Sequence, residues 1–544
     1  RSMRRVLLQL LLLSTSVASL DVLVYLLVVS KSHVDFVSTL VNTLTTRGHN
    51  VDLVLARLNS QTKTNGTHNA RNVISVDFPG TSPWMETEYL KAPFDDRFAW
   101  NPFSSPLPGF IDIAVELCRL VLDSPSLHAH LSSHSYDVAL VSSYDLCPLG
   151  LLHHHGIKPV TTFAATPTMP TQARAAGVPE LPLYENVMLA SRLDFDRGSF
   201  FHRSFAALRL WFDHVNEYGD MINKFNALFR ARLSPTFPCV RELSSNVSFD
   251  FANSNSLIAE PRPLPHRIKY IGGIALRKPK ALDEKFEKIL ASAKGDVILF
   301  SFGTQVLNER IPRVVVGNFV AAFKMFPDVT FVWKYDVTAE LNASTNVFVV
   351  DWLPQTDLLY DSRVSAFISH VGLNSLTEAA FAGVPLISIP LFVDQFHNAW
   401  RAQQLGIGVT LKKTELTAAN IRDELEKVLR QPSYRARARS LSQKLILNPD
   451  ESTRTFVESI EYAAKFKDLH EHLTPLGAHT SLAAHLGYDI VAFFLLVFSL
   501  AVAISCLVAY CGLLAIYHHL SQRLTQNLHK RTLKNSSKRR AKLE

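Results

Sequence analysis

Residues 352–395 read WLPQTDLLYDSRVSAFISHVGLNSLTEAAFAGVPLISIPLFVDQ. The apolar residues 364–368 predict a buried strand, and the small residues 369–374 predict the turn that follows it. A helix is expected to begin near Ser375. The apolar residues 384–390 predict the next strand. This alternation is typical of an α/β domain with a parallel sheet.

Polar side chains gather where the first of these strands gives way to the helix. A helix start favours phosphate, because its backbone N–H groups are unpaired and lie at the positive end of the helix dipole. His370, Asn374 and Ser375 add hydrogen-bond donors at the same point. Glu378 lies one turn inside the helix, where its carboxylate can accept two hydroxyls of a ribose.

The two ends of the stretch supply further candidate contacts. Trp352 offers a flat face and Gln355 an amide, which suit the stacking and hydrogen bonding of a base. Asp394 and Gln395 follow the second strand and can bind the hydroxyls of a sugar. The stretch thus holds one candidate contact each for a base, a ribose, a diphosphate and a sugar.

This ordered set resembles the signature of the UDP-glycosyltransferases, a family that includes the UDP-glucuronosyltransferases. The family usually has His-Gly-Gly where this chain has His370-Val371-Gly372. A positive φ at Val371 would cost energy, so the turn is expected to be slightly shifted. The resemblance implies two Rossmann-like domains facing across a cleft, the GT-B type. It also implies inverting transfer of glucose or glucuronate from a UDP-sugar to a hydroxyl of a small lipophilic acceptor.

A second strand and helix begin near the start of the chain. Residues 21–29 are apolar, residues 34–46 have a helical period, and residues 51–56 predict the next strand. His33 lies at the carboxyl end of the first strand, where open α/β sheets bind ligands. The resemblance makes His33 the general base, and an imidazole with a pKa of ~6.5 suits that role.

The resemblance also implies a carboxylate beside this histidine, at the end of the strand 138–141. Ser142 occupies that place, and a serine cannot offset the charge of an imidazolium. Asp145, three residues further on, is the candidate substitute. The alternative is a catalytically impaired subunit that binds UDP-sugar and pairs with active relatives. Transfer to a membrane lipid is another alternative.

A second phosphate loop is expected after the strand 297–302. Ser301, Gly303 and Thr304 resemble the loop of the family that faces the donor phosphates across from His370. Further strands at 329–333 and 347–350 continue the α/β series. Helix N-termini and His370 are expected to supply the positive potential for the diphosphate, and the sequence near the donor site has no Asp-x-Asp element. We therefore expect no metal and no cofactor, with the UDP-sugar as co-substrate.

The length and charge of the chain narrow its class. A chain of 544 residues is too long for one core and predicts two domains. The net charge of +8 comes from the ends, because residues 518–544 hold eight Lys or Arg and one Glu and the first five residues hold three Arg. The rest is nearly neutral, which argues against a nucleic-acid surface.

Both ends carry targeting patterns. The N-terminus has the basic, apolar and small-residue sections of a cleaved signal peptide, although the apolar residues 22–29 leave a signal anchor as the alternative. Residues 490–514 have no charge and are long enough to cross a bilayer once. The basic tail then places the C-terminus in the cytosol and the catalytic domains in the lumen. The last residues resemble an endoplasmic-reticulum retrieval signal, which predicts a type I protein of that membrane.

These observations divide the chain into seven segments. They are a signal peptide at 1–19, an acceptor-binding domain at 20–260, a linker at 261–268, a UDP-sugar-binding domain at 269–448, a return helix with a juxtamembrane segment at 449–489, a transmembrane helix at 490–514 and a cytosolic tail at 515–544. The sequence leaves open whether the chain forms homo- or hetero-oligomers.

Several smaller features complete the sequence. Cys118, Cys147 and Cys239 allow at most one disulfide in an oxidising lumen, with the pairing open. The run 153–155 is His-His-His, but adjacent histidines point in different directions and lack partners nearby, so we interpret it as helix and surface. Aromatic residues in 60–130 are candidates for an apolar acceptor pocket. The aromatic segment 192–232 predicts amphipathic helix packed on the first domain, with membrane contact as the alternative.

Overall fold

The computed structural model describes residues 19–58, 62–80, 83, 91–95, 109–168, 170–178, 198–212, 218–335, 345–447, 451–485 and 487–540. The chain divides into two compact units, Arg1–His479 and Thr480–Glu544. The expected signal sequence lies outside the described residues except for Ser19. Most aromatic residues of the expected acceptor segment, including Trp84 and Trp100, also lie outside them.

The first sheet has seven parallel strands in the order β3-β2-β1-β4-β5-β6-β7. Its strands are β1 (Asp21–Val28), β2 (Asn50–Arg57), β3 (Asn72–Asp77), β4 (Val138–Ser142), β5 (Val160–Ala164), β6 (Asp250–Ala252) and β7 (Ile268–Tyr270). The central strand β1 is apolar along its length because helices cover both faces of the sheet. Alternate residues of β1 therefore enter two different cores.

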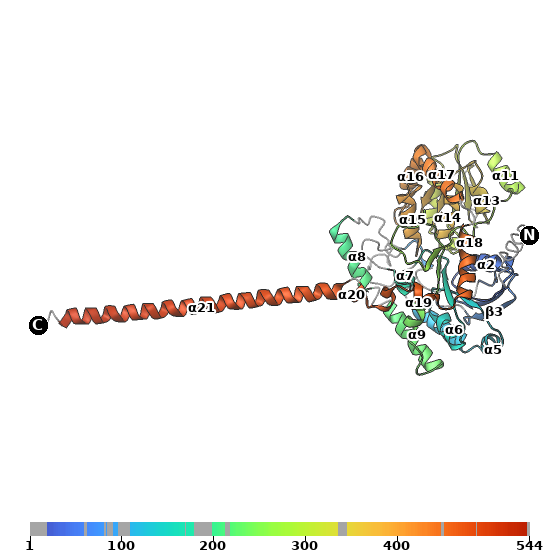
Figure 1. Cartoon of the computed structure of the whole chain (residues 1–544). Helices are drawn as coiled ribbons and strands as arrows, with labels where there is room; N and C mark the ends of the chain where they lie inside the picture. Colours follow the sequence, from blue (N-terminus) through green and yellow to red (C-terminus); the bar gives the residue numbers. More distant parts are fainter. Residues whose placement is uncertain are drawn as a thin grey trace, which may run out of the picture. The chain divides into compact units, whose positions relative to one another are not determined.

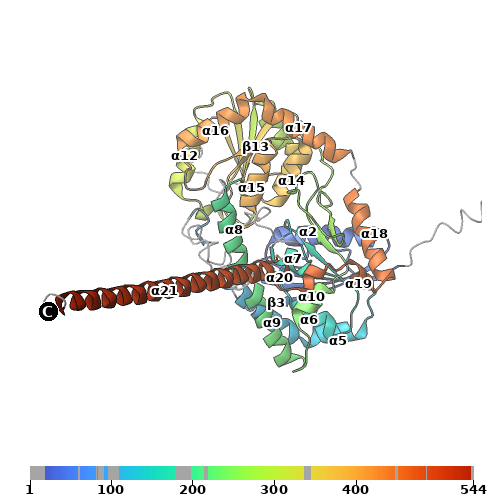
Figure 2. The same cartoon turned by 60° about the vertical axis from the view of Figure 1, so that its left-hand side comes forward.

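Helices from distant parts of the chain cover this sheet (Figures 1 and 2). One face packs against α2 (Lys31–Thr46) and α18 (Glu451–Lys465), which returns from the far end of the first unit. The other face packs against α4 (Phe110–Leu122), α6 (Cys147–His154) and α9 (Gly219–Arg232). The remaining helices of this half are α5 (Pro125–Ser133), α7 (Pro170–Ala175), α8 (Phe200–Phe212), α10 (Val240–Ser245) and α19 (Leu469–Leu473).

The second sheet has six parallel strands in the order β10-β9-β8-β11-β12-β13. Its strands are β8 (Val297–Ser301), β9 (Thr330–Lys334), β10 (Val347–Val350), β11 (Val364–Ser369), β12 (Leu386–Ser388) and β13 (Gly408–Thr410). Helices cover both of its faces (Figure 2). They are α11 (Glu284–Ala291), α12 (Arg313–Phe323), α13 (Gln355–Leu359), α14 (Leu373–Ala382), α15 (Gln395–Gln404), α16 (Ala418–Arg430) and α17 (Pro432–Ile446). The predicted α/β class with parallel sheets is confirmed.

The crossing between the two sheets differs from the predicted linker at 261–268. β7 pairs with β6 at the edge of the first sheet, so residues 261–267 connect two strands of the same sheet. The chain reaches the second sheet only between Tyr270 and Val297. Residues 261–265, which read PRPLP, form an irregular connection within the first half.

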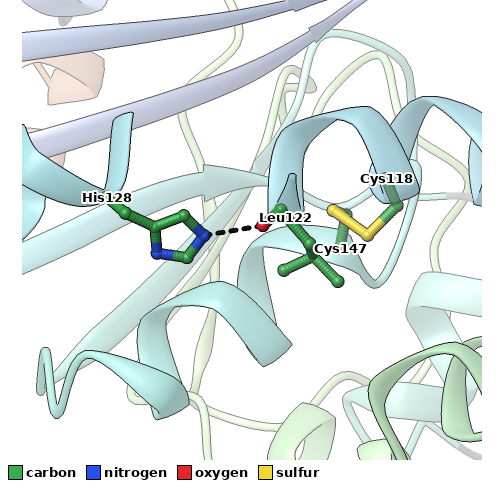
Figure 3. Close-up of a disulfide and its surroundings, with 4 residues drawn as sticks. All are labelled: Cys118, Leu122, His128 and Cys147. Atoms are coloured by element: carbon green, nitrogen blue, oxygen red, sulfur yellow. Dashed lines mark hydrogen bonds between the residues drawn. A yellow bond between two sulfur atoms is a disulfide. The ribbon is translucent and has the colours of Figure 1, made fainter. Parts of the chain in front are cut away.

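A disulfide joins Cys118 of α4 to Cys147 of α6 (Figure 3). Cys239 is not in a disulfide. The bond resolves the pairing that the sequence left open. It clamps two helices that pack on the same face of the first sheet.

The second unit contains α20 (Leu482–His485) and the long helix α21 (Tyr488–Arg540). Figure 1 shows α21 as one continuous helix that includes both the apolar segment 490–514 and most of the basic tail. It is long and apolar enough to cross a membrane. The helix therefore extends well beyond the end of the predicted span.

Candidate active site

One cavity of about 790 Å³ lies between the carboxyl ends of the strands of the two sheets. Every predicted site residue except Asp145 lines this cavity. These residues are His33, Ser301, Gly303, Thr304, Trp352, Gln355, His370, Gly372, Asn374, Ser375, Glu378, Asp394 and Gln395.

The strand order explains why these residues meet. In each sheet the chain winds outward in both directions from a central pair, β1 with β4 and β8 with β11. Such a reversal of strand order opens a crevice at the carboxyl edge of the sheet. His33 follows β1, whereas Ser301 and His370 end or follow the paired strands β8 and β11. The two crevices form the two sides of the cavity.

His33 is half-buried in the third position of α2. Burial lowers its pKa to about 4, because removal from water disfavours the charged imidazolium. The ring is therefore neutral at neutral pH. It stacks on Tyr144 with the ring centroids 4.9 Å apart and the planes inclined by 17°. Its Nδ1 atom is buried and has no hydrogen-bond partner among the residues that the structure describes.

Asp145 does not take the place of the missing carboxylate. Within the part of the chain that the structure describes, no hydrogen bond or ion pair joins it to His33, and its Oδ1 atom is itself unpartnered. Burial raises the pKa of Asp145 to about 8, so at neutral pH the group is mostly uncharged. Ser142 accepts a hydrogen bond from the backbone N–H of Leu27 at 2.9 Å. The hydroxyl therefore joins β4 to β1.

The turn between β11 and α14 has a left-handed residue at Val371, with φ of 54°. This is the strained conformation considered above, and for a β-branched residue it costs about 1–3 kcal/mol. Backbone comes close to His370 on two sides, from the loop after β8 and from the turn itself. A Cβ atom added at Gly303 would lie 2.6 Å from His370 Cε1, and one at Gly372 would lie 2.8 Å from its Nε2. A Cβ atom at either position would therefore force the His370 side chain to move.

His370 differs from its expected electrostatic role. Burial lowers its pKa to about 4, so the ring is neutral near pH 7 and can act as a hydrogen-bond donor but not as a cation. Arg277 and Lys280 also line this cavity, and the cation that acts on His370 is Lys334. Its Nζ donates to the carbonyl oxygen of Gly303 at 2.8 Å and lies 5.3 Å from the centre of the Trp352 ring.

The residues expected to hold the base and ribose form one network. Trp352 is 58% exposed, so its ring keeps accessible surface for stacking although Lys334 lies over it. The Gln355 amide donates to Glu378 Oε2 and, at 3.2 Å, to Ser375 Oγ. Thr356 donates to Glu378 Oε1 at 2.7 Å. The carboxylate is thereby fixed in the wall of the cavity before any ligand arrives.

Asp394 and Gln395 lie where α15 begins, after β12. Burial raises the pKa of Asp394 to about 6, and Asn398 donates to its Oδ2 at 2.7 Å. The side-chain oxygen of Gln395 accepts from the backbone N–H groups of Leu391 and Phe392, so it holds the loop in shape.

The comparisons with known proteins agree with this geometry. The sequence model of the UDP-glucoronosyl and UDP-glucosyl transferase family matches residues 22–519. The chain belongs to this family. UDP-glucuronosyltransferase 1A7 of Mus musculus is 29% identical over 393 residues, which cover 72% of each chain. UDP-glucosyltransferase 2 of Dactylopius coccus is 26% identical over 499 residues, covering 92% of this chain and 94% of that one.

Solved structures agree with the fold of this UDP-glycosyltransferase. The crystal structure of UDP-glucose:anthocyanidin 3-O-glucosyltransferase in complex with UDP aligns with a TM-score of 0.53 at 16% identity. The alignment covers 82% of this chain and 99% of that chain. The architecture is thus the GT-B type, and the chain is an enzyme of the UDP-glycosyltransferase class.

In this UDP-glycosyltransferase, Tyr144 and Thr356 contact predicted site residues although the sequence analysis did not select them. Tyr144 stacks on His33, and Thr356 holds Glu378. Tyr144 follows β4 as His33 follows β1, so its position after a strand was visible in the sequence. The contact between its ring and His33 was not, because it depends on how the turn after β4 folds.

Proposed function

We propose that this UDP-glycosyltransferase transfers glucuronate or glucose from its UDP-sugar to a hydroxyl of small lipophilic acceptors, with inversion at the anomeric carbon. One observation carries the proposal. A single cavity holds both His33 and the turn at the start of α14. Two reactants bound in one cavity react as one complex, which removes much of the entropic part of the barrier.

The donor would occupy the side of the cavity that belongs to the second sheet. The exposed face of Trp352 suits the base, and the fixed carboxylate of Glu378 suits two ribose hydroxyls. The N-terminal turn of α14, neutral His370 and cationic Lys334 suit the diphosphate. Asp394 would then accept hydroxyls of the sugar. These donors, together with Lys334 and the other cationic side chains that line the cavity, support transfer without a metal ion.

The acceptor would occupy the side that belongs to the first sheet. Apolar side chains line the cavity there, namely Val29, Phe110, Ile111 and Met221. Apolar contacts have little directional preference, which supports a range of acceptor shapes. Phe110 belongs to the aromatic segment that the sequence suggested for this purpose.

The proposed chemistry needs one proton acceptor. Neutral His33 removes the acceptor's hydroxyl proton as the oxygen attacks the anomeric carbon. The bond from that carbon to the diphosphate oxygen breaks, and its electron pair leaves with UDP. The new bond forms on the opposite face of the sugar, so the configuration inverts.

A membrane location completes the proposal. The length and apolar character of α21 support a single membrane anchor. The basic residues that follow the span support a cytosolic C-terminus and a lumenal active site. The endoplasmic reticulum is the proposed membrane.

The proposal is tested by UDP release from membranes that carry the chain, with a panel of phenols and either UDP-glucuronate or UDP-glucose. His33→Ala is expected to lower release about 10²–10⁴-fold while UDP binding persists. The matched control is His68→Ala, which changes an exposed histidine outside the cavity and should match the parent. Release that persists in His33→Ala would overturn the role of the base.

The second candidate is a donor-binding subunit with impaired turnover. It is favoured by the absence, among the described residues, of any hydrogen bond or ion pair between His33 and a carboxylate. This candidate would be supported if calorimetry shows that UDP binds while no phenol of the panel leads to UDP release. If UDP is released only when lipid acceptors are added to the same assay, the acceptor is a membrane lipid and not a small lipophilic compound.

A further inference from the structure

Three histidines form a cluster on the first half of the molecule, away from the cavity. His128 belongs to α5, His154 is the last residue of α6, and His155 follows it. One ring nitrogen from each lies within 4.8 Å of the other two. His154 and His155 thus have a partner, His128, on another helix. The sequence around the histidine run did not indicate this partner.

The hydrogen bonds of His128 determine which of its nitrogens is free to bind. Its Nε2 lies 2.8 Å from the carbonyl oxygen of Leu122, the last residue of α4 (Figure 3). A carbonyl only accepts, so Nε2 carries the proton and Nδ1 of the neutral ring presents a lone pair. That Nδ1 lies 2.8 Å from Nε2 of His155.

This arrangement is the one that metal-binding histidines adopt. A ligating imidazole usually donates its second N–H to a carbonyl or carboxylate, which fixes the ring and raises the basicity of the ligating nitrogen. Leu122 supplies that carbonyl here. The cluster also lies where α4 and α6 end, and the exposed carbonyls of a helix end favour a cation.

We propose that His128, His154 and His155 bind a zinc ion. Three imidazoles suit Zn²⁺ and related transition metals, whereas Mg²⁺ and Ca²⁺ prefer oxygen ligands. Tetrahedral zinc with bonds of ~2.05 Å sets the nitrogens ~3.3 Å apart, so His128 and His155 separate by about half an ångström. The proton on His155 Nε2 moves to its Nδ1, and water takes the fourth position.

Two neighbouring groups do not belong to the site. His153 packs against the edge of Phe237, with the ring centroids 5.2 Å apart. The second cluster of possible ligands, Asp52 with His130 and His134, is already occupied by protein. Its carboxylate pairs with Arg71 at 2.9 Å and accepts from Tyr136 at 2.8 Å.

The proposed zinc would stabilise the protein and would not take part in transfer, because none of its three ligands lines the cavity. The disulfide Cys118–Cys147 clamps α4 to the start of α6 (Figure 3). Zinc would tie the end of α6 to α5. The two bonds together would hold three helices of the same half.

The test uses the full chain in detergent, purified without a histidine tag and stripped of metal with a chelator. Bound Zn²⁺ is counted after equilibrium dialysis, and the melting temperature is measured with Zn²⁺ or Mg²⁺. We expect the parent to bind one Zn²⁺ more than His128→Gln or His154→Gln does. We also expect the melting temperature of the parent to rise with Zn²⁺ but not with Mg²⁺. His153→Gln is the matched control and should behave as the parent.

His154 is exposed, so its substitution leaves the fold intact even where His128→Gln does not. Equal zinc content and an equal thermal shift in the parent and His154→Gln would overturn the proposal. A parent that binds no Zn²⁺ would do the same and would leave the pair His128 and His155 as a simple hydrogen bond. Neither result depends on transferase activity.

Discussion

His33, which follows β1, and Tyr144, which follows β4, stack with their ring centroids 4.9 Å apart. The Tyr144 hydroxyl accepts a hydrogen bond from the backbone N–H of Ala165 at 2.6 Å, which fixes the tyrosine to the end of β5. The tyrosine thus holds the imidazole ring in one plane. It cannot stabilise a positive charge on that ring as a carboxylate does.

Tyr144→Leu should therefore lower kcat more than Tyr144→Phe. Leucine removes the flat surface and lets the imidazole turn, whereas phenylalanine keeps the stack and loses the hydrogen bonds of the hydroxyl, such as that from Ala165. We expect about a tenfold or larger loss of kcat in Tyr144→Leu, with the KM for UDP-sugar unchanged. The measurement is steady-state UDP release. Equal kcat values in both variants would show that the stack does not orient the base.

The pH dependence of kcat/KM should show two titrations below neutral pH, those of His33 and Asp394. His33, with its pKa near 4, acts as a base only while deprotonated, so kcat/KM falls as the pH drops through about 4. Asp394, with its pKa near 6, accepts sugar hydroxyls best as a carboxylate, so kcat/KM begins to fall below about 6. The expected profile is level from pH 7 to 8 and declines in two steps at lower pH.

The variant Asp394→Asn distinguishes the titration of Asp394 from that of His33. Its kcat/KM should be lower than that of the parent at pH 7.5 but should stay level down to about pH 5, since of these two groups only His33 still titrates. Melting temperatures at each pH serve as the control for unfolding. A decline near pH 6 that persists in Asp394→Asn would assign that step to another group.

Sequence reasoning succeeded where a feature depends on neighbouring residues. The apolar runs at 21–29 and 364–368 form central strands close to the predicted bounds, because both sheets are covered on two faces. The turn at 370–375 lies on the cavity because the carboxyl ends of parallel strands meet at one edge of the sheet.

It failed where a feature depends on residues far apart in the chain. Asp145 is near His33 in the expected fold, but the turn after β4 buries the carboxyl and presents Tyr144 to the ring. The partner of the histidine run is His128 on another helix, which no spacing along α6 indicates. The edge strand β7 was missed because it has only three residues and follows a proline-rich segment.

Gly303→Ala should destabilise the protein and weaken UDP binding. Gly303 has φ of +80°, and an added methyl would meet His370 at 2.6 Å, so the histidine must move. The backbone conformation alone costs about 1–2 kcal/mol for a residue with a Cβ atom. We expect a lower melting temperature and at least a tenfold higher Kd for UDP, measured by calorimetry.

The matched control is Gly317→Ala in the middle of α12, where a Cβ atom meets nothing within 4 Å. Alanine is the better helix former by about 1 kcal/mol, so this variant should be as stable as the parent or more so. UDP affinity should not change. Unaltered UDP binding in Gly303→Ala would mean that His370 does not contact the diphosphate.

Ser142→Asp should restore the carboxylate that is missing beside His33. Ser142 is buried at the end of β4, and its oxygen already accepts from the N–H of Leu27. An aspartate can keep that bond with one oxygen and present the other toward the unpartnered Nδ1 of His33. A carboxylate favours the imidazolium, so the pKa of His33 should rise from about 4 and the ring should become a stronger base.

The expected result is a higher kcat near pH 7 and a shift of the lower acidic step in kcat/KM toward neutral pH. Ser142→Asn is the matched control, since its amide oxygen can accept from Leu27 but carries no charge. A rise in kcat in Ser142→Asp alone would assign the gain to the charge, because the two side chains have nearly the same shape. An unchanged profile together with a lower melting temperature would mean that the new carboxylate is buried without a partner and that His33 works without one.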